Sequence, residues 1–279
     1  MTRAWILVAL ALGCGGQVEG GGRRIVSIGG AITETLFALG VGDDVVAVDR
    51  TSIYPAAAGA LPKVGLPGQI SVEGVAAQRP TLVIADGGAA PAAVSELAAV
   101  GLEVAALAEQ PSTPEGAVAR LRELGALVGR PAEAEALARE LLAEVAATRA
   151  AIAGAPRPRA MFVYARGHRT LLVAGEGTPA EAMMRLAGAD NAAVGFRDMK
   201  PMSAETVLAA RPEVIVIPTR GLESLGGVDG LLALPGIADT PAGRARRVVA
   251  VDDLALLGFG PRLGEGLAAL ARGLHPEPR

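Results

Sequence analysis

The 279-residue chain has a single cysteine, Cys14, and only two histidines, His168 and His275. One cysteine excludes an intramolecular disulfide and any metal site built from several thiolates. The patterns G-x-S-x-G and H-E-x-x-H are also absent, which removes support for a serine hydrolase or a zinc protease. We therefore predict no catalytic residues and a protein that is not an enzyme, with a carboxylate-dependent reaction as the less favoured alternative.

Aromatic residues make up only 3% of the chain, and the formal net charge is −3 without any run of Lys or Arg. This charge balance gives no basic surface for nucleic acid, so no nucleic-acid partner is expected. Gly29-Gly30 follow an apolar run but lack the G-x-G-x-x-G spacing of a dinucleotide loop. The apolar content of 51% is typical of a folded chain, and 279 residues are long enough for two ordinary domains.

The N-terminus has the pattern of an export signal. Arg3 is followed by the apolar run Ala4 to Gly13, and Ala11-Leu12-Gly13-Cys14 resembles the lipobox of bacterial lipoproteins. The apolar run is too short for a permanent transmembrane helix. We expect residues 1–22 to be a lipoprotein signal peptide and Gly-rich tether, and the mature protein to be periplasmic and held at a membrane only by a lipid on Cys14. An ordinary cleaved signal peptide is the alternative.

One segment of the chain occurs twice. Residues 70–85 read ISVEGVAAQRPTLVIA and residues 202–217 read MSAETVLAARPEVIVI. Each copy has a Ser suited to cap a helix, a Glu in the first helical turn, an Arg-Pro stop and a β-branched strand. A helix followed by a strand is one step of a parallel sheet, so the repeat predicts two similar lobes.

Predicted strands and helices alternate along the rest of the chain, which is typical of parallel α/β sheets. Between the two copies, residues 131–153 form an Ala/Leu/Glu/Arg-rich stretch without glycine or internal proline, and Gly154 and Pro156 end it. The predicted fold is α/β, with two Rossmann-like lobes of parallel strands joined by one long helix. The expected parts are an N-terminal lobe at 23–130, a linking helix at 131–156 and a C-terminal lobe at 157–279.

Ligands of open α/β sheets bind beyond the carboxyl ends of the strands, so two lobes on a strut predict a cleft between them. The segments expected to face the cleft are 29–33, 54–69, 86–90, 164–170, 196–200, 219–221 and 252–260. Among them, the loop from Tyr164 to Arg169 gathers a phenol, an imidazole and two guanidinium groups. Imidazole is a common metal ligand, and Arg pairs well with carboxylates. A solvated surface loop is the alternative interpretation.

Several segments together resemble a known family. They include RIVSIGGAITETLFALG, LPKVG, the two repeat copies, VAGEGTPAEAMMRLAG and VVAVDDLALLGFGPRL. From about Arg24 to Pro276 the chain resembles the haem-binding, HmuT-like branch of the iron-complex and cobalamin binding proteins of ABC importers. The resemblance implies a monomeric solute-binding protein that carries haem, as transported ligand rather than catalytic cofactor, to a permease dimer with its ATPase. It also implies that Glu73 and Glu205 dock on the permease.

The chain departs from the family pattern at its metal ligand. Haem-binding relatives typically read LPxVGY, with the Tyr as axial ligand, whereas this chain has Leu66 at that position. Met199 stands where many relatives carry an aromatic residue. His168, Met199 and Tyr164 are then the candidate replacements, and we predict His168 as the ligand of the haem iron. The predicted ligand contacts are Tyr164, Arg166, His168, Arg169, Leu66, Met199 and Lys200.

The resemblance leaves other ligands open. Cobalamin and an iron-siderophore are the alternatives within the same class of binding proteins, and a receptor or sensory module with the same fold is a further one. The absorption spectrum after incubation with haemin separates the haem hypothesis from the others. If His168 is the ligand of the iron, replacing His168 would change that spectrum.

Overall fold

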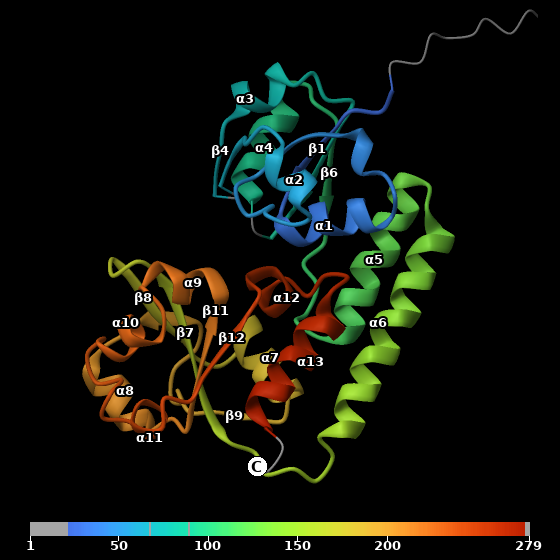
Figure 1. The fold of residues 1–279 in the computed structure, drawn as a ribbon. Coiled ribbons are helices and arrows are strands. Elements are labelled where there is room, and N and C mark those ends of the chain that lie inside the picture. The colour runs from blue at the N-terminus through green and yellow to red at the C-terminus, as the bar shows by residue number, and fades with distance from the viewer. Residues whose placement is uncertain (1–21, 67, 89, 277–279) are drawn as a thin grey trace, which may run out of the picture.

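The computed structural model describes residues 22–66, 68–88 and 90–276 as two α/β lobes with a pair of long helices beside them (Figure 1). Cys14 and the rest of the predicted signal peptide and tether up to residue 21 lie outside the described residues. Among the residues that are described, none of the helices has the length and apolar character needed to cross a bilayer.

The N-terminal lobe is built on a four-stranded parallel sheet in the order β2-β1-β5-β6. Its central strands are rich in Ile and Val and are buried on both faces, as in other parallel sheets. Its elements are β1 (Ile25–Ile28), α1 (Gly30–Ala38), η1 (Gly42–Asp44), β2 (Val45–Val48), α2 (Ala56–Ala60), β3 (Gly65–Leu66), β4 (Gln69–Ile70), α3 (Val72–Ala77), β5 (Leu82–Asp86), α4 (Pro91–Ala99) and β6 (Val104–Leu107). Strands β3 and β4 form a separate two-stranded hairpin.

The C-terminal sheet follows the order β10-β8-β7-β11-β12, with β9 paired to β7. Its elements are β7 (Arg159–Arg166), β8 (Thr170–Ala174), α7 (Pro179–Leu186), β9 (Asp190–Asn191), β10 (Met199–Pro201), α8 (Ala204–Ala210), β11 (Val214–Pro218), α9 (Thr219–Ser224), α10 (Val228–Leu232), α11 (Pro241–Arg244), β12 (Val248–Val251), α12 (Asp253–Leu257) and α13 (Leu263–Leu274).

The predicted α/β fold is confirmed, but the second sheet is mixed rather than parallel throughout. Strands β7, β11 and β12 are parallel, whereas β8 runs antiparallel to both β7 and β10. The cause is the tight turn after Arg166, where Gly167 has a φ of 59° and lets the chain reverse at once. A tight turn can join only antiparallel strands, because a parallel connection needs a crossover.

The sequence repeat is a structural repeat. Helix α3 begins after Ser71, whose hydroxyl accepts the Gly74 N–H, and α8 begins after Ser203, whose hydroxyl accepts the Thr206 N–H. Each helix is followed by an arginine with positive φ, Arg79 at 48° and Arg211 at 46°, before the chain enters an inner strand of its sheet. Matching caps and matching turns show that both copies use the same helix-to-strand geometry.

One long helix, α6 (Pro131–Ala151), joins the lobes, and a second long helix packs along it. Helix α5 (Pro114–Val128) lies antiparallel beside α6, and α13 packs against α6 as well (Figure 1). The first half of α5 packs in the core of the C-terminal lobe through Leu121, whereas Leu124 and Val128 belong to the core of the N-terminal lobe. Gly125 permits the close approach of the pair, because a Cβ there would lie 2.4 Å from the Ala134 side chain.

The linking helix is shorter than the predicted range of 131–156. It ends at Ala151, since Ile152 leaves the helical conformation and Gly154 has a φ of 78°. The linking helix is packed along its length by α5, whose side chains lie in both cores.

Candidate ligand-binding cleft

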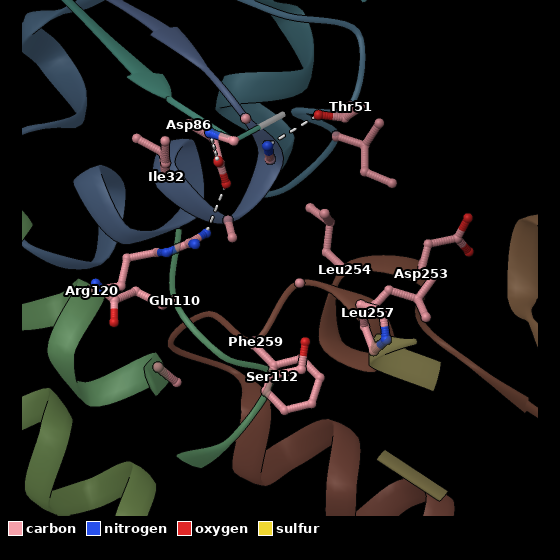
Figure 2. Close-up of a pocket in the computed structure, with 18 of the residues that line it drawn as sticks. Ile32, Thr51, Asp86, Gln110, Ser112, Arg120, Asp253, Leu254, Leu257 and Phe259 are labelled. Atoms are coloured by element: carbon pink, nitrogen blue, oxygen red, sulfur yellow. Dashed lines mark hydrogen bonds and ion pairs between the residues drawn. The ribbon is translucent and has the colours of Figure 1, made fainter. Parts of the chain in front are cut away.

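A cavity of about 880 Å³ lies between the two lobes, close to the upper end of the range of roughly 300–1,000 Å³ that is usual for ligand sites. Ile32 and Thr51 reach it from the N-terminal lobe, and Leu254, Leu257 and Phe259 reach it from the C-terminal lobe (Figure 2). The carboxyl ends of β5 and β7 open onto it through Asp86 and Arg166. This is the position expected for ligands of open α/β sheets.

A buried carboxylate shapes the N-terminal wall of the cleft. Asp49 is fully buried and accepts hydrogen bonds from the Gly29 N–H at 3.1 Å, from the Ser52 hydroxyl at 2.6 Å and from Thr51. Thr51 in turn accepts the Gly30 N–H at 3.0 Å. The hydrogen bonds from Gly29 and Gly30 join the β1–α1 turn to the loop after β2, and those from Thr51 and Ser52 to Asp49 fix the loop itself, so this wall is held by the protein's own contacts.

Two ion pairs line the cleft. Arg120, from the middle of α5, lies 3.2 Å from Asp86 (Figure 2), and Arg166 lies 3.0 Å from Asp253. Asp253 is 7% exposed and also accepts a hydrogen bond from the backbone N–H of Arg220 at 3.1 Å. These pairs neutralise two of the cleft's arginines, so they serve mainly to fix the walls.

Two further arginines of the cleft are available for a ligand. Arg50 from the N-terminal lobe and Arg220 from the C-terminal lobe both line the cavity and are exposed. Within the described residues, neither guanidinium group has a carboxylate at ion-pair distance. One cationic group on each lobe suits a ligand that carries two negative charges.

Tyr164 stands on the wall between the main cavity and a smaller chamber of about 240 Å³. Its ring is half-buried, and the Arg166 guanidinium lies 4.6 Å from the ring centroid. Asp253 holds that guanidinium from the other side. The Tyr164 ring therefore packs against a guanidinium that an ion pair holds in place.

The structure brings four of the seven predicted contact residues to these cavities. Tyr164, Arg166 and Leu66 line the main cavity, and Met199 lines the smaller chamber. His168, Arg169 and Lys200 are exposed and line neither.

The expectation that His168 ligates the metal therefore finds no support in its position. The reason is the turn at Gly167, whose N–H donates to the Ser224 hydroxyl of α9 at 2.9 Å and places the tip of the hairpin beyond the cleft wall. Lys200 lies 5.2 Å from the centroid of the Phe196 ring instead of in the cleft.

Several cleft residues were missed by the sequence reasoning. Arg50 and Thr51 follow β2, and residues 109–112 follow β6, so the rule about strand ends was sufficient to find them. Arg120 had no such signal, because it lies in the middle of a helix whose direction relative to the sheet is set by tertiary packing.

A second contact between the lobes lies beside the cleft. Arg262, at the start of α13, is held by Glu34 of α1 at 2.5 Å and by Asp252 at 3.0 Å, and its guanidinium lies 3.7 Å from the centroid of the Tyr54 ring. The Glu34 side chain is only 4% exposed. Burial raises the pKa of Glu34, while its hydrogen bond with Arg262 acts in the opposite direction.

The family described as "Periplasmic binding protein" matches residues 25–255. Among curated proteins, the vitamin B12-binding protein of Salmonella typhimurium is 30% identical over 204 residues, which cover 72% of this chain and 74% of that protein. An uncharacterised ABC transporter substrate-binding lipoprotein of Bacillus subtilis, YvrC, is 26% identical over 260 residues, or 91% of this chain and 81% of that protein.

Two solved structures are more similar to this chain in sequence than these two curated proteins are. The periplasmic haem-binding protein RhuT from Roseiflexus sp. RS-1, solved in its apo form, is 42% identical with a TM-score of 0.85, and the match covers 91% of this chain and all of that chain, 100%. The periplasmic haem-binding protein BhuT, solved with two haems, is 41% identical with a TM-score of 0.82, and the match covers 90% of this chain and 97% of that chain.

Proposed function

The chain belongs to the periplasmic binding protein family, and we propose that it is the solute-binding component of an ABC importer that captures haem in the cleft between its lobes. Its relatives are substrate-binding transport proteins, not enzymes, in agreement with the lack of a catalytic constellation in the sequence. The observation that carries the choice of haem is Tyr164, a phenol fixed on the cleft wall beside an arginine.

Tyr164 is the best candidate for the axial ligand of the iron. Tyrosinate and thioether side chains both bind haem iron in proteins. Among the described residues that line the main cavity, Tyr164 is the single phenol, and neither His nor Cys is present. The Arg166 guanidinium packs over the Tyr164 ring, 4.6 Å from its centroid, and so helps hold the ring beside the cavity. We therefore assign the iron to Tyr164 in place of His168.

The two available arginines complete the site. Haem carries two propionates on one edge, and Arg50 and Arg220 offer one guanidinium from each lobe. A ligand held by both lobes would favour an arrangement in which the two walls of the cleft face each other across it, because its two charges are both paired only in that arrangement. The apolar side chains of Ile32, Leu254 and Phe259 suit the faces of the macrocycle.

Replacing Arg50 or Arg220 by Gln is expected to weaken haemin binding by about three- to tenfold each, because a charge-assisted hydrogen bond is lost at a partly exposed position. Binding of each variant should also depend less on ionic strength. Absorption titrations at low and high salt measure both effects. The matched control is haem dimethyl ester, which has no propionate charge and should bind the parent protein and both variants with equal affinity. Equal affinities of the three proteins for haemin would contradict the assignment.

Titration of the purified mature protein with haemin, followed by its absorption spectrum, tests the proposed function directly. We expect saturable binding and a spectrum typical of tyrosinate-ligated ferric haem. Failure to bind haemin would exclude haem as the transported ligand.

Cobalamin is the second candidate, because the curated relatives that bind vitamin B12 or cobalamin match 70% or more of this chain. Cobalamin brings its own axial base and carries amides at the rim of its corrin ring, so it would need neither Tyr164 as a metal ligand nor the two arginines as ionic partners. Competition between haemin and cyanocobalamin in the same titration distinguishes the two ligands. We expect cyanocobalamin not to displace haemin.

We also propose that Glu73 and Glu205 dock on the permease. Both are exposed in the first turns of α3 and α8, which lie at the outer ends of the two lobes and away from the cleft (Figure 1). The repeat gives each lobe the same carboxylate on the same kind of helix end. Such a pair suits a partner with two similar subunits.

Charge reversal tests this docking. Glu73→Arg and Glu205→Arg are expected to reduce haem uptake by reconstituted transporter about tenfold or more, because like charges then face each other. Haemin affinity of the isolated protein should stay unchanged, since neither residue lines the cleft. Glu96→Arg, on the exposed face of α4, is the control for a simple change of net charge. Normal uptake by both docking variants would show that the assignment is wrong.

We also propose that Cys14 carries a lipid that holds the protein at the membrane. The family is that of the periplasmic binding proteins, and the B. subtilis relative is a lipoprotein by name, which supports this proposal. A diacylglycerol on Cys14 would give the stable anchoring that one acyl chain does not provide. The protein would then act as a monomer at the membrane surface, close to its permease.

A further inference from the structure

The smaller chamber beside Tyr164 is distinct from the main cavity in its lining. It has a volume of about 240 Å³ and lies between β7, β8 and β10 on one side and the start of α7 on the other. Its lining is Phe162, Tyr164, Leu172, Thr178, Pro179, Ala180, Met199 and Leu257. Three of these residues, Tyr164, Pro179 and Leu257, also line the main cavity, so the two spaces are adjacent and share a wall.

The chamber offers almost no polar partner to its contents. The Thr178 hydroxyl is used internally, because it donates to the Gly175 carbonyl at 2.9 Å and accepts the Glu181 N–H at 3.1 Å. Apart from the Tyr164 phenol, the remaining lining side chains are hydrocarbon or thioether. Water in such a space finds few hydrogen-bond partners on the protein. An apolar group that displaced it would therefore gain affinity.

The size of the chamber sets what fits. An apolar cavity of about 150 Å³ is large enough for a benzene molecule, so this one accommodates the edge of a single five-membered ring with short hydrocarbon substituents. It does not accommodate a whole macrocycle. Tyr164 lies on the shared wall, so a ligand that contacts its phenol in the main cavity lies directly beside the chamber.

We propose that this chamber is a specificity subsite that receives the vinyl-bearing, apolar edge of the tetrapyrrole. The propionate edge then faces the main cavity, where Arg50 and Arg220 lie. The subsite discriminates against tetrapyrroles that carry carboxylates or amides at that edge, since these groups would lose hydrogen bonds to water and find almost no polar partner in the lining. This inference rests on the proposed binding of haem.

A comparison of haemin with deuterohaemin, in which hydrogens replace the two vinyl groups, tests the subsite. The protein is expected to bind haemin roughly tenfold more tightly, which corresponds to burial of about two additional hydrocarbon carbons. Met199→Gln nearly preserves the side-chain volume but adds a polar group. It should weaken haemin, leave deuterohaemin almost unchanged and bring the ratio of the two affinities close to one.

Two further measurements make the result specific. Leu172→Phe, which fills the chamber from strand β8, should also weaken haemin more than deuterohaemin, so the outcome does not depend on one variant folding. Leu142→Gln, on the exposed face of α6, is the control and should keep the parent ratio. The absorption spectrum of bound haem should be the same in all variants, because none removes the iron ligand.

The possible outcomes separate this inference from the proposed function. Equal affinities of the parent protein for haemin and deuterohaemin, or a parent-like ratio in Met199→Gln and Leu172→Phe, would overturn the subsite while haem binding stands. A parent protein that binds neither compound would overturn the proposed function, and the subsite with it.

Discussion

Replacing Tyr164 by phenylalanine is expected to weaken haemin binding by about a hundredfold or more and to remove the absorption band of the iron–phenolate bond. Loss of groups that merely support a metal ligand costs about 10- to 100-fold in affinity, and loss of the ligand itself should cost at least as much. The Phe ring keeps the packing of Tyr164 and its contact with Arg166, so the free energy of unfolding should change little. Absorption titration and thermal unfolding of the same samples measure the two quantities.

His168→Ala is the matched control, because His168 follows Tyr164 closely in the chain but is exposed in the hairpin turn. It should leave both the spectrum and the affinity unchanged. A changed spectrum in His168→Ala together with a normal one in Tyr164→Phe would restore the ligand predicted from the sequence and contradict the assignment made from the structure.

The second large effect is expected from Arg262→Met. This change leaves Glu34 as a buried carboxylate without its main partner, and breaking a buried pair from one side typically costs about 3–5 kcal/mol. Chemical denaturation at neutral pH measures the loss. In the double variant Arg262→Met/Glu34→Gln the buried charge is gone, so most of the stability should return. Arg122→Met, which breaks the exposed pair with Glu135, is the control and should change stability little.

The loss should depend on pH with a definite sign. Burial raises the pKa of Glu34 above the ordinary value of 4.5, so the folded state binds its proton more tightly than the unfolded state does. The stability that comes from this proton is fully present below pH 4.5 and is lost as the pH rises through the folded-state pKa. Asp252 and Glu265 raise that pKa as well, whereas Arg262 lowers it.

Removing Arg262 should raise the pKa of Glu34 further and extend this window upward. Arg262→Met is therefore expected to lose much more stability at pH 7 than at pH 4, where Glu34 is largely protonated. The Glu34→Gln background should show no such difference. An equal loss at both pH values would show that the carboxylate charge is not the cause.

Much of the architecture could be predicted from local patterns. The repeat around Ser71 and Ser203 gave two lobes because a cap, a first-turn carboxylate and an Arg-Pro stop act within a few residues of each other. The same local chemistry marked most strands and helices, and the rule that ligands bind at strand carboxyl ends located the cleft. It also named Tyr164 and Arg166 as contacts, since both lie near the end of a predicted strand.

Other features depended on contacts between distant parts of the chain. A turn at Gly167 decided that Tyr164 reaches the cleft and that His168, four residues on, does not. The packing of α5 across both cores brought Arg120 to Asp86, and folding joined Glu34 to Arg262, 228 residues further along. The sequence determined this protein's elements because the causes of helices, strands and turns are local. Only the tertiary structure decided which side chains share the cleft, because side-chain direction and inter-lobe pairing depend on how those elements pack.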